Sequence, residues 1–144
     1  MEKLKIIGGN RLSGSISCSG AKNAALPMLA ATILTDKTVT FSNLPYLQDI
    51  TTMFEILGSM GADITLNENM DFIISTANLH DFEARYELVK TMRASILVLG
   101  SLVGRYGFAR IALPGGCAIG TRPVDFHLSA LEPVSYTHLR AHET

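Results

Sequence analysis

The sequence predicts a mixed α/β (α+β) fold, because short strand-like segments alternate with helix-like segments along the chain. Residues 38–41 alternate polar and apolar side chains with period two, as a half-buried strand does, whereas the apolar residues of 49–60 recur on one helical face. The chain has 144 residues, of which 47% are hydrophobic. That is enough for the core of one ordinary domain, or of one piece of a larger domain.

The first half of the chain is expected to contain strands, two helices and a hairpin. The segments that predict them are the strands 3–7 and 14–18, the helix 24–35, the strand 38–41, the helix 49–60 and the hairpin 62–66 and 72–75. Gly58 and Gly61 are expected to end the second helix, because glycine is common just past a helix C-terminus. The polar run 67–69 supplies the turn of the hairpin.

The second half is expected to contain the same kinds of element. They are a connecting loop over 78–85, a long helix over 86–102, a strand over 110–113 that leads into the glycine-rich segment 114–120, and a third helix over 123–132. Pro133 interrupts that helix, and the apolar stripe begun by Val124 and Leu128 does not continue. Residues 133–144 are therefore expected to be a foreign tail.

Composition excludes several classes of protein. Lys plus Arg number 12 and Asp plus Glu number 13, so the net charge of −1 offers no basic field for nucleic acid or for an anionic membrane. The N-terminus lacks the apolar core of a secretory signal, and the apolar segment 24–34 is too short to span a bilayer. Two cysteines are too few for a disulfide scaffold. We expect a soluble protein of the reducing cytoplasm.

The strongest local feature is the segment 114–125, in which three glycines surround Cys117. Glycine lets the backbone approach a ligand closely, and a nearby helix start together with Arg122 favours the thiolate. Such a thiol can donate a proton or attack an electrophile near neutral pH. The alternative is an inert, buried cysteine in a tight turn. We expect the reactive cysteine at Cys117 and the inert one at Cys18, inside a strand.

Two further groups of cations are candidates for binding an anion. Lys22 and Asn23 start an apolar helix, where a cation and an amide beside backbone N–H groups suit a phosphate or carboxylate. On spacing alone an ordinary helix start with a solvated lysine is commoner, and the P-loop pattern is absent. Lys90 and Arg93 lie one turn apart on the predicted long helix, although a solvated face is the commoner explanation there too.

Metal chemistry is not expected. His138 and His142 have the i, i+4 spacing of a metal pair, but no third ligand is near them in the sequence.

Asp125 is expected to cap a helix or to accept a hydrogen bond from a hydroxyl group. These residues alone predict a cysteine-dependent α/β protein with cations placed for an anionic substrate.

Three motifs, in order, carry a resemblance to a known family. Residues 20–27 (GAKNAALP), 88–95 (LVKTMRAS) and 113–125 (LPGGCAIGTRPVD) together closely resemble the UDP-N-acetylglucosamine 1-carboxyvinyltransferase family, the enolpyruvyl transferases of bacterial peptidoglycan synthesis. The resemblance runs from Met1 to Glu132. The cysteine after Pro-Gly-Gly favours this family over the related shikimate-phosphate enolpyruvyl transferases.

The resemblance implies transfer of the enolpyruvyl group of phosphoenolpyruvate to the 3′-hydroxyl of UDP-N-acetylglucosamine, with release of phosphate and with no metal or other cofactor. It implies that Cys117 is the general acid toward the phosphoenolpyruvate methylene, and that Lys22, Asn23 and Arg122 bind phosphoenolpyruvate. The residues that it implies for binding UDP-N-acetylglucosamine are Arg93, Arg122, Pro123, Val124, Asp125 and Phe126.

The resemblance also implies the architecture. Each of two similar domains would be an inside-out α/β barrel of repeated strand–helix units, with a cleft between the domains. Residues 1–20 would be strands that pack with a C-terminal domain missing from this chain, and residues 21–132 would be an incomplete first domain. The alternative is that the isolated chain is a truncated, non-catalytic fragment with at most weak binding of the nucleotide sugar.

Overall fold

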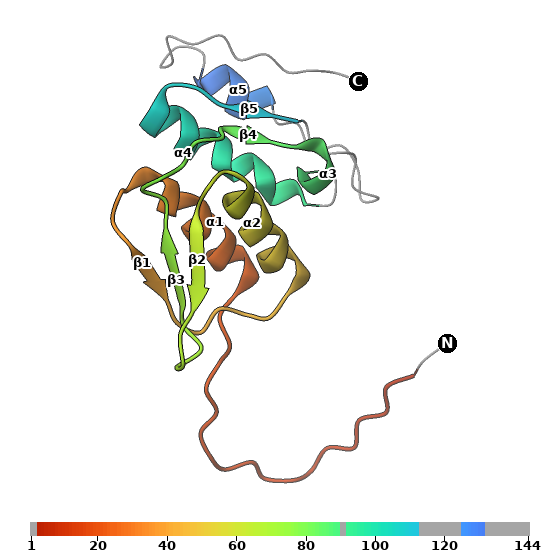
Figure 1. Ribbon diagram of the computed structural model, residues 1–144. Helices are drawn as coiled ribbons and strands as arrows, with labels where there is room; N and C mark the ends of the chain where they lie inside the picture. Colours follow the sequence, from red (N-terminus) through yellow and green to blue (C-terminus); the bar gives the residue numbers. More distant parts are fainter. Residues whose placement is uncertain (1–2, 90–91, 113–124, 132–144) are drawn as a thin grey trace.

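The computed structural model describes residues 3–89, 92–112 and 125–131 of the chain. Helices and strands alternate in it, so the predicted mixed α/β class is confirmed (Figure 1). In chain order the elements are α1 (Lys22–Ala31), η1 (Thr32–Leu34), β1 (Val39–Phe41), α2 (Gln48–Ser59), β2 (Asp63–Leu66), β3 (Phe72–Ser75), β4 (Glu83–Ala84), α3 (Tyr86–Val89), η2 (Arg93–Ile96), α4 (Leu97–Tyr106), β5 (Arg110–Ile111) and α5 (Asp125–Leu131).

The first half forms an antiparallel sheet of order β1-β3-β2, in which the last strand of the three is central. β2 and β3 form the predicted hairpin. Its turn is closed by Asn67, whose Oδ1 accepts hydrogen bonds from the backbone nitrogens of Asn69 at 2.9 Å and Asp71 at 2.8 Å. Helices α1 and α2 lie together beside this sheet (Figure 1), and the ring of Phe54 on α2 packs 4.6 Å from that of Phe72 on β3.

Of the two glycines predicted to end helix α2, Gly58 and Gly61, the second one follows the helix in a left-handed conformation. Gly61 has a φ of 101°, which favours glycine because a Cβ would be strained there. The nitrogen of Ala62 donates to the oxygen of Leu57, and that of Gly61 to the oxygen of Gly58, each at 3.0 Å. These two hydrogen bonds satisfy the carbonyls of Leu57 and Gly58, which the end of the helix would otherwise leave unpaired. Gly58, the other candidate, lies inside α2.

The second half pairs β4 with β5 in parallel, with α3, η2 and α4 between them in the chain. β4 lies in the segment 78–85, so the predicted loop is confirmed over 78–82 but is wrong at residues 83–84. The predicted helix 86–102 is also broken, because Met92 has an extended backbone with φ −138° and ψ 112°. Val89 and Met92 are both buried on either side of this break, so packing has overridden the helical propensity of the segment.

Helix α4 connects the two halves by packing against α1 and η1. Its Arg105 donates from Nη1 to the backbone oxygens of Ile33 and Thr35, both at 2.9 Å, and of Thr76 at 3.1 Å. The Arg105 guanidinium carbon also lies 5.0 Å from the centroid of the Tyr106 ring. One cation thus satisfies carbonyls at the end of η1 and beyond β3, which ties the second half of the chain to the first.

One contiguous core joins these elements. It is made of aliphatic side chains from both halves of the chain, with a relative exposure of 9% or less. Its members that are 0% exposed are Leu29, Ile33, Met53, Ile56, Leu57, Met60, Ile74, Val89, Val98 and Leu102. None of the helices in the described parts of the chain is both long enough and apolar enough to cross a membrane.

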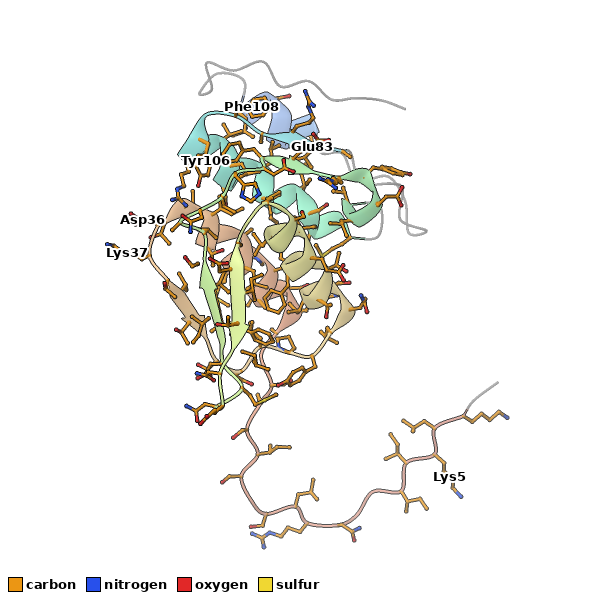
Figure 2. The ribbon with its side chains drawn as sticks, in the orientation of Figure 1. Lys5, Asp36, Lys37, Glu83, Tyr106 and Phe108 are labelled. Atoms are coloured by element: carbon orange, nitrogen blue, oxygen red, sulfur yellow. The ribbon has the colours of Figure 1, made fainter. Side chains whose placement is uncertain are left out.

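Residues 3–20 form an extended arm that leaves the body of the protein (Figure 1), and Lys5 projects from it away from every element (Figure 2). The strands predicted at 3–7 and 14–18 are not formed in this described segment, because no neighbouring strand offers hydrogen bonds to it. Its apolar side chains are almost fully exposed, with Leu4 at 89% and Ile16 at 92%. Cys18, expected to be buried, is exposed.

Candidate functional site

Asn43 fixes the path of the chain into α1. Its backbone is left-handed, with a φ of 57°. Its Nδ2 donates to the oxygen of Cys18 at 3.1 Å, and its Oδ1 accepts from the nitrogen of Gly20 at 3.3 Å. A Cβ atom at Gly20 would collide with the backbone oxygen of Asn43. The last residues before α1 are therefore held against the turn that precedes α2.

The start of α1 is poorly suited to helix stability. The N-cap is Ala21, whose methyl group cannot accept the hydrogen bond that a Ser, Thr, Asp or Asn would accept there. The first helical residue is Lys22, a cation at the positive end of the helix dipole. Pro27 has no N–H, so the carbonyl of Asn23 loses its i→i+4 partner. Conflicts of this kind with local preference are expected at functional sites.

An ion pair with α2 offsets the misplaced charge of Lys22. Its Nζ lies 2.7 Å from Oδ2 of Asp49, which is in the first turn of α2. Asp49 is favourable to α2 itself, because a carboxylate at a helix N-terminus interacts well with the dipole. The side chains of Lys22 and Asp49 are 44% and 35% exposed, so a ligand from solvent can reach the pair.

Asn23 follows Lys22 in the first turn of α1 and is exposed. The site therefore offers a cation, an amide and the backbone N–H groups of a helix start, all accessible from solvent. Such groups are suited to a phosphate or a carboxylate. The structure thus brings together the first pair of predicted site residues, Lys22 and Asn23, and adds Asp49 to them.

The other predicted site residues are described only in part. Arg93 is the first residue of η2, and its side chain lies outside the described part of the structure. It is not on a continuous α-helix with Lys90 as predicted, because the extended Met92 precedes it. Asp125 is the first residue of α5, and Phe126 of that helix is 76% exposed. Outside the described residues lie Cys117, Arg122, Pro123 and Val124.

Sequence reasoning missed Asp49 and Asn43 as parts of this site. Asp49 was taken only as the first residue of the predicted helix 49–60, and Asn43, in the segment between the strand 38–41 and that helix, was given no role in the site. One signal pointed to a missing carboxylate: Lys22 stands at a helix start with no acidic residue in the same turn. That signal does not say which of the 13 acidic residues supplies the charge.

A known protein family matches almost the whole chain. Residues 6–137 match the family model of EPSP synthase (3-phosphoshikimate 1-carboxyvinyltransferase). The chain belongs to the EPSP synthase family. The enolpyruvyl transferase resemblance drawn from the three motifs is therefore confirmed at the level of the family.

Curated relatives within this family have a more specific name. The chain is 58% identical over 131 residues to the UDP-N-acetylglucosamine 1-carboxyvinyltransferase of Halorhodospira halophila, and 57% identical over 131 residues to that of Coxiella burnetii strain RSA 493. These matches cover 91% of this chain, but 31% and 30% of the two relatives. The chain thus spans about a third of the length of the curated relatives that it matches.

A solved structure has a similar fold. The enolpyruvyl transferase NikO from Streptomyces tendae superimposes with a TM-score of 0.59 and 29% sequence identity. The match covers 71% of this chain and 24% of NikO. The strand–helix arrangement of the described residues is therefore that of a part of an enolpyruvyl transferase.

Proposed function

We propose that this chain is the first part of a UDP-N-acetylglucosamine 1-carboxyvinyltransferase. The complete enzyme, meaning a chain of the relatives' length that begins with these residues, transfers the enolpyruvyl group of phosphoenolpyruvate to the 3′-hydroxyl of UDP-N-acetylglucosamine and releases phosphate. The observation that carries this proposal is the identity of 57–58% with relatives of that name. In this proposal the reaction takes place in the cytoplasm and begins the synthesis of peptidoglycan.

The start of α1 is the proposed subsite for phosphoenolpyruvate. The Lys22 ammonium and the Asn23 amide are accessible at a helix N-terminus, which is favourable for a phosphate or carboxylate. Arg122 completes this subsite in the proposal. Since both substrates are anions, the cations offset their mutual repulsion and orient them for reaction.

Cys117 is the proposed general acid. The hydroxyl oxygen adds to C2 of phosphoenolpyruvate while the thiol gives its proton to the methylene carbon. Loss of one proton of the resulting methyl group to the thiolate, and of phosphate, which carries away the proton of the hydroxyl group, then restores the double bond. A thiol can supply a proton near neutral pH and take it back. In this proposal UDP-N-acetylglucosamine is held by Arg93 and by the segment 122–126, in keeping with the resemblance carried by the motifs 88–95 and 113–125.

The proposal also assigns a role to a second domain, with which the N-terminal residues of this chain pack. Residues 1–20 pack with a second domain, and residues 21–132 belong to the first domain, an inside-out barrel that further strand–helix units complete. The exposed apolar side chains of the arm, among them Leu4 and Ile16, support this arrangement, because apolar side chains in water favour a partner surface. The isolated 144-residue chain is then a non-catalytic fragment that binds the nucleotide sugar weakly at most.

Phosphate release tests the proposal. The complete enzyme is mixed with phosphoenolpyruvate and UDP-N-acetylglucosamine, and phosphate and the enolpyruvyl sugar nucleotide are measured by colorimetry and mass spectrometry. We expect both products in equal amounts, and neither from the isolated chain. Release with shikimate 3-phosphate in place of the sugar nucleotide, or no release with either acceptor, contradicts the proposed substrate.

A further inference from the structure

Lys22 and Asp49 form an ion pair between the starts of two helices, α1 and α2. An ion pair as exposed as this one contributes little to the free energy of unfolding, because water screens both charges. The two residues nevertheless come from different helices and meet at 2.7 Å, at the point where both helices begin. The contact therefore fixes the position of the ammonium group more than it adds to the free energy of unfolding.

The ion pair leaves Lys22 able to bind a ligand. A lysine ammonium has three N–H donors, and its single contact with Asp49 Oδ2, at 2.7 Å, does not engage all of them. The side chain remains 44% exposed, so the other donors are accessible. A free lysine has four rotatable bonds that an arriving anion must order, and that ordering weakens binding. A lysine already held by a carboxylate has lost much of this freedom before the anion arrives.

The segment 43–49, which supplies Asp49, also holds the backbone that leads into α1. Asn43 fixes Cys18 and Gly20 before α1 begins, and Asp49 follows Asn43 after one turn and one helix start. The segment 43–49 therefore holds the entrance of α1 by two separate contacts, one to its backbone and one to its cation. This arrangement is suited to a group that must stay in one place while the ligand comes and goes.

We propose that Asp49 is a positioning residue, whose carboxylate holds the Lys22 ammonium at the start of α1 in the orientation that receives the anionic substrate. The identification of that anion as phosphoenolpyruvate rests on the proposed function. Asp49 also carries a negative charge that repels the substrate. In this proposal the gain from the ordered lysine outweighs that repulsion, so removal of the carboxylate weakens binding.

Kinetics of the complete enzyme test the proposal. Asp49→Asn is expected to raise the KM for phosphoenolpyruvate about 3- to 10-fold, to leave the KM for UDP-N-acetylglucosamine unchanged, and to leave the thermal midpoint nearly unchanged. Asp49→Glu should recover part of the loss. The matched control is Glu83→Gln, which removes another exposed ion pair, 3.5 Å from Arg110, and should change neither KM. An unchanged or lower KM for phosphoenolpyruvate in Asp49→Asn overturns the proposal.

A double-mutant cycle shows whether Asp49 acts through Lys22. In a Lys22→Ala background, Asp49→Asn is expected to have no further effect on the KM for phosphoenolpyruvate, because the group that it positions is gone. A fold-change as large as in the wild-type background means that Asp49 acts on the substrate by itself. That result also overturns the proposal.

Chemical labelling tests the positioning without reference to activity. In the 144-residue chain, reductive methylation followed by mass spectrometry should modify Lys22 more slowly than the exposed Lys37 (Figure 2). Asp49→Asn should remove most of this difference, and Glu83→Gln should not. If the complete enzyme fails to release phosphate, the proposed function fails while labelling still decides the role of Asp49. Equal labelling of Lys22 in the wild type and in Asp49→Asn overturns the positioning role alone.

Discussion

The backbone nitrogen of Gly20 donates a hydrogen bond to Oδ1 of Asn43 at 3.3 Å, and the backbone oxygen of Asn43 lies too close for a side chain at residue 20. The contact joins the segment that enters α1 to the segment that enters α2. Since Lys22 and Asp49 follow directly in these two helices, the geometry of the ion pair depends on this backbone contact. Gly20, the first residue of the first motif, thus has a steric reason to be glycine.

Gly20→Ala is expected to destabilise the chain by about 1–3 kcal/mol, because the new Cβ collides with the backbone oxygen of Asn43 and the turn must shift. Urea unfolding followed by circular dichroism measures the change. The control is Gly8→Ala in the arm, where a Cβ would meet nothing within 4 Å. Equal unfolding midpoints for the two variants would contradict the close contact.

Arg105→Met is expected to lower the free energy of unfolding by about 2–3 kcal/mol, since the carbonyls of Ile33 and Thr35 lose a charged donor. Methionine retains an apolar stem, so that lost packing contributes little. Arg85→Met is the comparison, because Arg85 is 69% exposed and lies 3.7 Å from Asp81; its effect should stay below about 0.5 kcal/mol. Comparable losses in both variants would show that the carbonyl contacts of Arg105 are weak.

Cys117→Ala is expected to reduce phosphate release by the complete enzyme about 100-fold or more, because the proposed general acid is lost. Cys18→Ala provides the matched control, since Cys18 is an exposed cysteine of the arm, and its activity should stay within about twofold. Steady-state kinetics with both substrates measure the two variants. Full activity of Cys117→Ala would exclude a thiol acid.

The amide protons of residues 3–19 are expected to exchange rapidly in the 144-residue chain, because these residues are extended and exposed. In the complete enzyme they should be protected at least about 100-fold, once a second domain supplies strand partners and covers the apolar side chains. Hydrogen exchange with mass spectrometry compares the two forms. Fast exchange of the arm in both would contradict its proposed packing.

The elements that depend on local pattern could be predicted from the sequence. The helix 49–60 was found as α2 at 48–59, because its apolar residues repeat with the helical period. The hairpin was found at 63–66 and 72–75, because two short apolar runs flank a polar turn. In both cases the deciding information lies within a few residues along the chain.

The errors occurred where distant contacts decide the structure. β4 consists of Glu83 and Ala84 and forms a strand only because β5 lies beside it. The helix break at Met92 follows from burial of that side chain, which composition does not reveal. The arm shows the converse, because residues 3–7 and 14–18 have strand-like sequence but no strand partner among the described residues.

The same distinction applies to the candidate site. Lys22 and Asn23 were recognisable because they interrupt the start of an apolar helix within one turn. Asp49 was not, because its contact to Lys22 joins two helices and depends on how α1 packs against α2. Cys117 and Arg122 lie outside the described residues, so their roles remain predictions from the motif.

The strand order β1-β3-β2 has a consequence for the order of events during folding. The hairpin of β2 and β3 closes a short loop and can form early, because its residues are near neighbours in the chain. β1 has no partner until β3 exists, since Val39 pairs with Ile74. On the ribosome, the sheet of β1, β3 and β2 therefore cannot form beside α1 and α2 until residue 75 has been synthesised.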